Sequence, residues 1–217
     1  YTLSLPSSAI QGIILVMKEL KFDIFEDGPL VKSVSITKIM PCMAEEGRVK
    51  LAMQLDSTLE QVMPIFAGKF PPGKVNYIPH KKILTLNTHQ RVISFFPSGK
   101  IMMMNTRDPE EGIEIITEFM EKINQCYLDS ESGDVGEDLS EKLSNIGPLN
   151  IYNCLPQTNC EECGTATCMA FSMKLLSGDS TLNQCKPLLK AENQDKVNSL
   201  KELLGDQLMK TLGWVGN

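Results

Sequence analysis

Four cysteines in the C-terminal third of the sequence constrain this chain more than any other feature. Cys160, Cys163 and Cys168 fall close together, and Cys185 follows after a gap long enough for a helix. In this C-x2-C-x4-C-x16-C spacing, four thiols can close around one soft metal centre. A site made only of sulfur ligands is typical of zinc or of an iron–sulfur cluster. The sequence therefore predicts a metal centre here, with the rest of the chain as the scaffold that carries it.

The spacing favours one kind of centre over the other. Zinc sites usually pair their thiols as two C-x2-C units some distance apart. Here three thiols are bunched and one is remote, which suits a larger cluster whose irons need spaced sulfurs. The order is the reverse of the plant-type C-x4-C-x2-C run, so that ferredoxin class is not a direct match. Zinc stays open as an alternative, whereas free or disulfide-bonded cysteines are disfavoured at this cysteine density in a chain that we expect to be intracellular.

The residues that flank the cysteines sharpen this prediction. They match the pattern L-P-x-T-x-C-x-x-C-G-x-x-T-C-x-x-F-A through its Phe, as Leu155-Pro156-Gln157-Thr158-Asn159-Cys160, Cys163-Gly164 and Thr167-Cys168-Met169-Ala170-Phe171. This pattern resembles the small [4Fe-4S] domain of the corrinoid iron–sulfur protein (the acetyl-CoA decarbonylase/synthase gamma subunit) of anaerobic one-carbon metabolism. A related domain occurs in the B subunit of the Rnf electron-transport complex. The resemblance covers about residues 149–188 and implies that a [4Fe-4S] cluster is bound by Cys160, Cys163, Cys168 and Cys185.

Two positions depart from the family pattern. Glu161 stands where the family often has Gly, and Lys186 precedes Pro187 where the family usually has Pro directly after the fourth cysteine. These changes affect polarity and hydrogen bonding near the cluster and leave the four ligands in place.

The sequence around Cys168 also predicts local structure that suits an anionic centre. A helical pattern begins near Cys168, and a helix N-terminus offers free N–H groups and partial positive charge. Gly164 permits a left-handed turn beside the metal. Gly178 is expected just after the end of the helix. Cys42, Cys126 and Cys154 are additional thiols. Cys154 lies close enough to the motif to pack beside the cluster, but a small buried apolar residue is the better interpretation.

The preceding part of the chain predicts an α+β fold, a curved antiparallel sheet backed by helices. Three helices are expected, each with a capping residue at its N-terminus. Ser7 and Ser8 begin a helix that ends near Leu20, Asp56 begins one that ends near Gly68, and Asp108 begins one that ends near Gln125. Short apolar runs between turn signals predict strands. They are Leu30–Met40, Val49–Leu55, Val75–Ile78, Ile83–Leu86, Val92–Phe96 and Ile101–Met104.

One stretch of this part weakly resembles a repeat of the TATA-box-binding protein family. It is the hairpin Ile93-Ser94-Phe95-Phe96-Pro97-Ser98-Gly99-Lys100, which leads into the helix at Asp108. DNA binding does not follow, because nucleic-acid sites need clustered Lys and Arg side chains. Only Lys81, Lys82 and Arg91 suggest a basic patch, and a solvated strand edge explains them better. We therefore expect no nucleic-acid partner.

An acidic segment marks the expected boundary between two domains. Residues 128–141 contain six acids and no Lys or Arg, so they account for the whole net charge of −6. With their Gly and Ser residues they read as a solvated linker or an acidic tether. The predicted organisation is a scaffold and partner-binding domain at 1–127, a linker at 128–148 and a mostly helical cluster module at 149–217. In that module, helices are expected over Glu192–Leu204 and Asp206–Leu212.

Nothing in the sequence predicts bond-making chemistry by side chains. His80 and His89 are the only histidines, and no nucleophile-elbow or phosphate-loop motif occurs. The apolar run Ala9–Met17 is too short to span a bilayer. We therefore expect a non-enzymatic protein in the cytoplasm, either free or peripheral to a larger complex.

Three functions fit these features. The first is electron transfer to a corrinoid protein or methyltransferase, the partner that the family resemblance implies. The second is a redox- or oxygen-responsive regulatory subunit that binds a corrinoid methyltransferase. The third is a module in which the metal only stabilises the fold.

Overall fold

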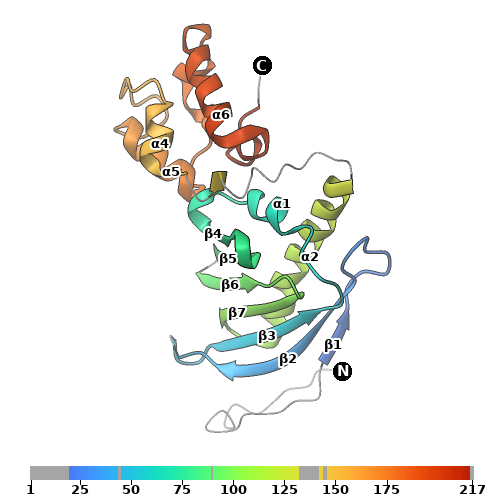
Figure 1. Ribbon diagram of the computed structural model, residues 1–217. Coiled ribbons are helices and arrows are strands. Elements are labelled where there is room, and N and C mark those ends of the chain that lie inside the picture. The colour runs from blue at the N-terminus through green and yellow to red at the C-terminus, as the bar shows by residue number, and fades with distance from the viewer. Residues whose placement is uncertain (1–19, 44, 89, 132–141, 144–145, 216–217) are drawn as a thin grey trace.

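The computed structural model describes residues 20–43, 45–88, 90–131, 142–143 and 146–215 (Figure 1). These residues form a seven-stranded antiparallel sheet with helices on one face and a group of helices at one end of the sheet. The predicted α+β class is confirmed. The helix predicted from Ser7 to about Leu20 lies outside the described residues up to position 19. Leu20, the predicted end of that helix, is the first residue of a strand.

The strands follow the order β1-β2-β3-β7-β6-β5-β4, and every neighbouring pair is antiparallel. The six predicted strands are all present, and β1 is an additional edge strand that the sequence analysis did not identify. The bounds are β1 Leu20–Asp23, β2 Ser33–Pro41, β3 Val49–Leu55, β4 Val75–Ile78, β5 Ile83–Thr88, β6 Arg91–Phe95 and β7 Lys100–Thr106.

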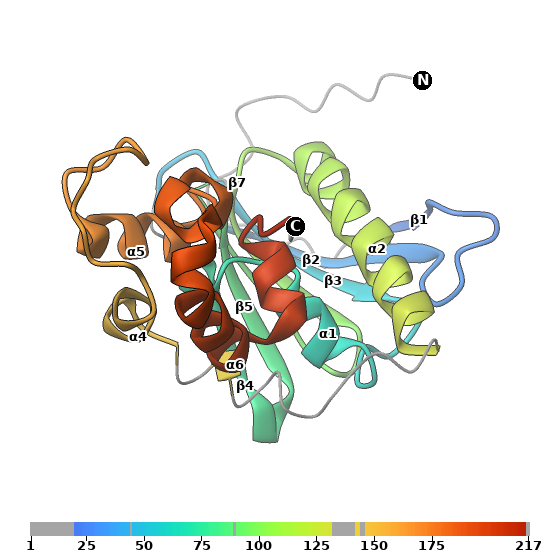
Figure 2. The ribbon, with the colours of Figure 1, turned by 90° about the horizontal axis from the view of Figure 1, so that it is seen from above.

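The core lies on one face of the sheet because apolar side chains alternate along the strands. In β3, for example, Leu51, Met53 and Leu55 are buried while Lys50 and Gln54 point to the other face. Two helices cover the core face, α1 (Met63–Gly68) and α2 (Pro109–Glu131), as Figure 2 shows. The rings of Phe66, Phe95 and Phe119 meet there edge to face, with centroids 5.1–6.4 Å apart.

The helix predicted from Asp56 is shorter than expected. It begins only at Met63, since the Asp56 carboxylate accepts hydrogen bonds from the backbone N–H groups of Lys32 and Ser33 instead of capping a helix. Asp56 therefore ties the end of β3 to the start of β2. Pro64 does not interrupt a helix but lies in its first turn, where proline is tolerated.

The helix after β7 is longer than expected. Asp108 caps it as predicted, accepting the backbone N–H of Glu111 at 2.8 Å. The helix continues to Glu131 rather than ending near Gln125, so the first four residues of the predicted linker are helical. Asp129 in this extension pairs with Lys69 beyond α1 at 2.7 Å. The rest of the acidic stretch, 132–141, lies outside the described residues.

The small basic patch suggested by the sequence is not a set of free cations. Arg91 forms an ion pair with Glu111 of α2 at 2.6 Å, and Lys82 pairs with Glu60 at 2.6 Å. Arg91 thus points to the helix side and ties β6 to α2.

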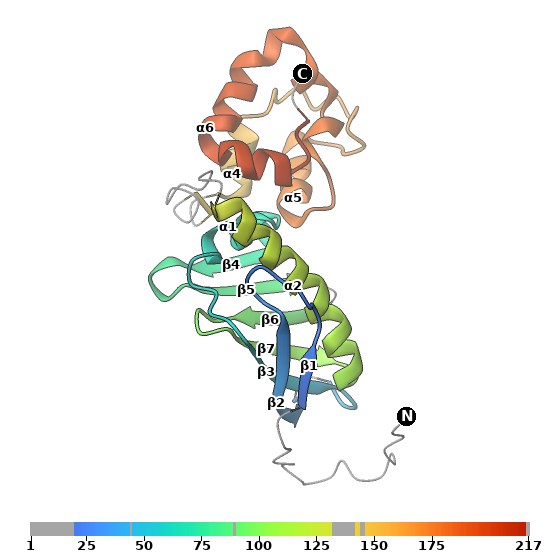
Figure 3. The same cartoon turned by 90° about the vertical axis from the view of Figure 1, so that its right-hand side faces the viewer.

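The C-terminal helices form a second apolar core at the β4 end of the sheet, beside α1 (Figure 3). They are α4 (Pro148–Asn153), α5 (Cys168–Ser177) and α6 (Gln194–Thr211). Three short 3-10 turns, Leu182–Gln184, Lys186–Leu189 and Ala191–Asn193, lie between α5 and α6. Two further 3-10 turns, Pro72–Lys74 and Pro79–Lys81, flank β4. Gly205 breaks α6 with a left-handed φ of 73°, which matches the two helices predicted on either side of it.

Several contacts hold the two cores together. The Gln207 side chain donates to the carbonyl of Ile65 at 3.0 Å, and the Thr211 hydroxyl donates to the carbonyl of Gly68 at 2.7 Å. Gly178, just after α5, lies against Pro71. Among the described helices, none combines the length and apolar character needed to cross a membrane.

Candidate metal centre

The four predicted cysteines line one cavity. Cys160 and Cys163 come from the loop between α4 and α5, Cys168 is the first residue of α5, and Cys185 lies between two 3-10 turns. Residues distant in sequence are thus brought together by the packing of α5 against the segment that follows it. The remaining lining residues are Thr158, Asn159, Glu161, Thr165, Thr167, Phe171 and Pro187.

Cys168 is held by both ends of its loop. The Asn159 carboxamide oxygen accepts the backbone N–H of Cys168 at 2.9 Å, and the Thr167 hydroxyl caps the helix by accepting the N–H of Ala170 at 3.1 Å. The helix ends at Gly178 in a left-handed conformation, as predicted. Since Phe171 and Leu175 are buried in the C-terminal core, the position of Cys168 is fixed by packing as well as by hydrogen bonds.

The four thiols differ in their access to water. Cys168 and Cys185 are buried, Cys163 is half-buried and Cys160 is exposed. Burial raises the pKa of the Cys185 thiol to about 11. Cysteine binds a metal as the thiolate. Because burial keeps the Cys185 thiol protonated, metal binding at this residue has to release its proton. One edge of the cavity, at Cys160, faces solvent.

The loop before Cys163 has an unusual backbone. Gln157, Asn159 and Glu161 have left-handed φ values of 59°, 47° and 62°, which non-glycine residues adopt at a cost of about 1 kcal/mol or more. Glu161 is the position where the family often has Gly, and its φ gives the physical reason for that glycine. Gly164, with φ 78°, is left-handed as predicted. Of the three strained positions, only Asn159 carries a residue type that signals this conformation.

The residues present fit an iron–sulfur cluster. All four donors are thiols, the ligands that soft metals and clusters prefer. Within the described residues, no three His, Cys, Asp or Glu side chains converge as a site for a single metal ion. The four cysteines line one pocket, and cysteine thiolates are the ligands that hold iron–sulfur clusters in proteins.

The other cysteines lie away from this cavity. Cys42 and Cys126 are buried, and Cys154 is half-buried against the C-terminal core. Cys154, expected to be a small buried apolar residue, is partly buried against the C-terminal core and does not line the cavity. His80 is exposed on the turn after β4, and His89 lies outside the described residues.

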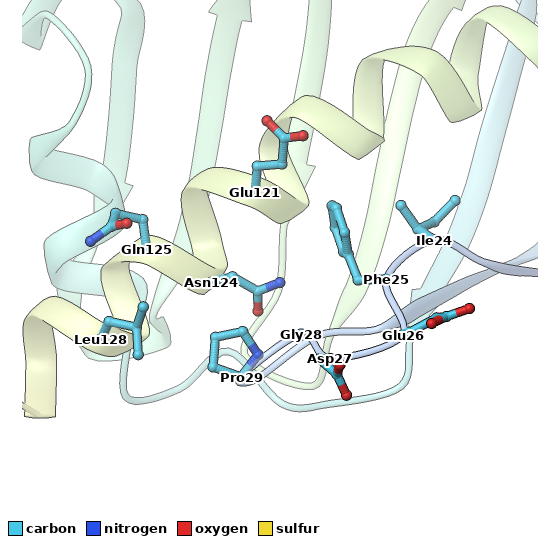
Figure 4. A pocket seen from close by; sticks show the side chains of 10 residues that line it. All are labelled: Ile24, Phe25, Glu26, Asp27, Gly28, Pro29, Glu121, Asn124, Gln125 and Leu128. Atoms are coloured by element: carbon cyan, nitrogen blue, oxygen red, sulfur yellow. The ribbon is translucent and has the colours of Figure 1, made fainter.

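A second hollow lies between the β1–β2 loop and the C-terminal half of α2 (Figure 4). Asn124 lines this hollow, and its side-chain amide makes three hydrogen bonds to the β1–β2 loop. The Asn124 oxygen accepts from the N–H groups of Leu30 and Val31, and its nitrogen donates to the carbonyl of Val31. Asn124 therefore fixes the loop on the helix, a role that no local sequence pattern indicates.

The comparison with known proteins bears on the cysteine cavity. Residues 155–187 match a family model described as "Putative Fe-S cluster". This segment is an iron–sulfur module. It contains all four cysteines that line the cavity.

Curated relatives agree with this assignment of the module. The chain is 44% identical over 71 residues to acetyl-CoA decarbonylase/synthase complex subunit gamma 2 of Methanosarcina thermophila, covering 32% of this chain and 15% of that protein. It is 57% identical over 37 residues to the corrinoid/iron-sulfur protein large subunit of Moorella thermoacetica, an alignment that covers 17% of this chain and 8% of that protein. The acetyl-CoA decarbonylase/synthase complex subunit gamma of Archaeoglobus fulgidus is 39% identical over 74 residues, which cover 32% of this chain and 16% of that protein.

The chain therefore spans only about 15% of the length of the curated gamma subunits that it matches. The predicted resemblance of the C-terminal module to this family is confirmed. No solved structure matches the chain significantly.

Proposed function

We propose that this chain is a [4Fe-4S] protein that docks on a corrinoid protein or methyltransferase of anaerobic, methanogenic or acetogenic, one-carbon metabolism and transfers electrons to it. The observation that carries the proposal is the cavity lined by four cysteines inside the segment that matches the iron–sulfur family. The printed names of the relatives, a corrinoid/iron-sulfur protein and decarbonylase/synthase gamma subunits, support the class of partner.

The four cysteines would hold the cluster, which when bound supplies one-electron transfer at a potential set by its surroundings. Cys168 and Cys185 provide buried anchors, whereas Cys160 is exposed. The Cys160 edge is therefore the place where a partner can approach most closely. Glu161 and Glu162 are both exposed beside it and would favour a partner surface with positive charge at that point.

The sheet domain supplies a second feature that supports partner binding. On the face opposite the core, Lys21, Lys38, Lys50 and Lys100 project from β1, β2, β3 and β7, as their register shows. Asp23 is the only acid in the seven strands, and it pairs with Lys21 at 2.9 Å. By contrast, α2 carries seven acids and one lysine. This separation of charge suits a protein partner with an acidic, partly apolar surface on the sheet side.

A second candidate function is a redox- or oxygen-responsive regulatory subunit. It is favoured by the position of α5, whose first residue is Cys168 and whose end packs on the sheet domain. A side chain at Gly73 would lie 2.8 Å from the carbonyl oxygen of Leu176, so the backbones are in close contact there. Changes at the cysteines would therefore reach the interface between the two cores through one short helix.

The proposal is tested with protein purified under anaerobic conditions. We expect about four iron and four sulfide per chain, and binding to a purified corrinoid protein with reduction of its cobalt centre under a low-potential donor. A chain that binds one zinc and no iron would overturn the electron-transfer function and leave a structural metal site. A regulatory subunit is distinguished by affinity that changes tenfold or more, about 1.4 kcal/mol, between reduced and oxidised forms.

A matched pair of variants tests the lysine face. Lys38→Glu with Lys100→Glu should weaken binding to the corrinoid protein and reduce its salt dependence. The control is Lys201→Glu, which reverses the charge of an exposed residue on α6, away from the sheet face. This substitution should weaken binding to the corrinoid protein less. We expect the protein in the cytoplasm, in association with such a complex.

A further inference from the structure

Thr165 lies in the cysteine cavity next to one of the predicted ligands. Its Oγ1 is 2.9 Å from the Sγ of Cys163, a hydrogen-bonding distance. The next acceptor is the carbonyl oxygen of Thr167 at 3.4 Å, which is longer and weaker. Thr165 is only 7% exposed, so water competes little for its hydroxyl group.

Ligation fixes the direction of this hydrogen bond. In the free thiol, either Cys163 or Thr165 can donate. A thiolate ligand has no proton, so with Cys163 bound to metal only the Thr165 hydroxyl can be the donor. Hydrogen bonds to charged acceptors are the stronger ones, and this bond forms in a site shielded from water.

We propose that Thr165 is a positioning residue that donates a hydrogen bond to the Cys163 sulfur and raises the reduction potential of the cluster. The inference rests on the proposed [4Fe-4S] centre. Hydrogen bonds to cluster sulfurs are one of the factors that set its potential. A donor stabilises the more negative, reduced state most, because the reduced state places more charge on the sulfurs. The Oγ1–H proton stays on Thr165 in both states, and the electron comes from the external reductant.

Thr165 differs in this respect from the other threonines of the cavity. The Thr167 hydroxyl is already used as the helix cap. Thr158 is exposed to solvent. The family pattern leaves the position of Thr165 open, so its hydroxyl is a feature of this chain rather than of the cysteine motif. The structure thus assigns to Thr165 a tuning role that the spacing of the cysteines does not specify.

The test is a redox titration of the intact chain, followed by electron paramagnetic resonance with dithionite as the reductant. Thr165→Val removes the hydroxyl at nearly constant volume. We expect a midpoint potential lower by about 59 mV, a tenfold change in the equilibrium constant of a one-electron reduction. Thr165→Ser restores the donor and should restore most of the potential. Thr85→Val is the control, since it removes the Thr85–Ser94 hydroxyl contact within the sheet, away from the cavity.

A second readout keeps the inference testable if Thr165→Val does not assemble a cluster. In the wild-type chain, pulsed resonance in H2O and D2O should detect a strongly coupled exchangeable proton, which Thr165→Ala should lack. The role of Thr165 is refuted if a variant without the hydroxyl keeps the wild-type midpoint potential. It is also refuted if Thr165→Ser lowers the potential as much as Thr165→Val does. Absence of iron and sulfide from the wild-type chain would instead refute the proposed cluster, and the two failures are therefore distinguishable.

Discussion

The side-chain oxygen of Asn159 and the backbone N–H of Cys168 are joined by a hydrogen bond of 2.9 Å. This bond spans the loop that contains Cys160 and Cys163, so it closes that loop without using any of the four thiols. Asn159 also adopts a left-handed φ of 47°, which Asn tolerates better than most residues. One residue thus supplies both the backbone turn and the acceptor that place the first three thiols around one cavity.

Two substitutions at Asn159 separate these contributions. Asn159→Gly keeps the backbone turn and loses the acceptor, so it should destabilise the C-terminal core by about 1 kcal/mol. Asn159→Ala loses both and should cost about 2 kcal/mol or more. Both should speed the loss of iron to a chelator, with Ala faster than Gly, as followed by the decay of visible absorbance. Equal rates for wild type and Asn159→Ala would show that the bond does not hold the loop.

The proposed ligands are tested by removing single thiols. Cys168→Ser should abolish the brown colour of the anaerobic protein, because it replaces a soft thiolate by a hard hydroxyl at a buried position. Cys42→Ala and Cys126→Ala, which change thiols outside the cavity, should keep iron and sulfide at wild-type levels. Loss of iron in either control at unchanged stability would mean that the ligand set is wrong.

The sequence predicted the local features of the site well because they depend on short-range rules. The helix start at Cys168 and the turns at Gly164 and Gly178 follow from capping and from left-handed glycine geometry. The approach of Cys185 to the other thiols was expected from the spacing of the four cysteines and from the family pattern, not from a local structural rule. Its position depends on how α5 packs against the following turns, which no local rule encodes.

Two of the differences in the helices involve side chains that bond to partners distant in the sequence. Asp56 looked like a helix cap, but its carboxylate bonds the backbone of Lys32 and Ser33. Asn124 of α2 likewise accepts the backbone N–H of Val31, 93 positions away. The extension of α2 to Glu131 includes Asp129, which pairs with Lys69. Local patterns cannot show such partners, since they depend on the finished packing.

The packing between the two cores can be tested at Gly178. An added Cβ there would lie 2.7 Å from Cγ of Pro71, and the residue also has a φ of 74°. Gly178→Ala should therefore cost about 1–2 kcal/mol from the backbone and 1–3 kcal/mol more from overpacking. Gly47→Ala is the matched control. Gly47 has a similar φ of 80°, but a Cβ added there would have no heavy atom within 4 Å to clash with.

Chemical denaturation measures both glycine variants. Hydrogen exchange should show the additional effect of Gly178→Ala mainly at α5 and at the turn Pro72–Lys74. An equal loss of stability in the two variants would mean that the contact with Pro71 contributes nothing and that the cost arises from the backbone alone.

Cys126 predicts how stability depends on pH. Burial in the sheet core raises the pKa of its thiol to about 12 from an ordinary value near 9, with smaller effects from Lys69 and Asp129. A raised pKa in the folded state means that the stabilisation is fully present below about pH 9 and is lost as the pH rises toward 12. Unfolding exposes the thiol, which then ionises, so the folded state should lose on the order of 2 kcal/mol by pH 11 from this group alone.

The measurement compares wild type with Cys126→Ala in urea from pH 7.5 to 11, with reductant and without oxygen. Other groups that titrate in this range, including the cysteines of the cavity, affect both proteins equally and cancel in the difference. Alanine leaves a small cavity and a loss that does not depend on pH. The stability advantage of the wild type should therefore shrink as the pH rises above 9. A constant difference across this range would show that the Cys126 thiol ionises as readily in the folded chain as in the unfolded one.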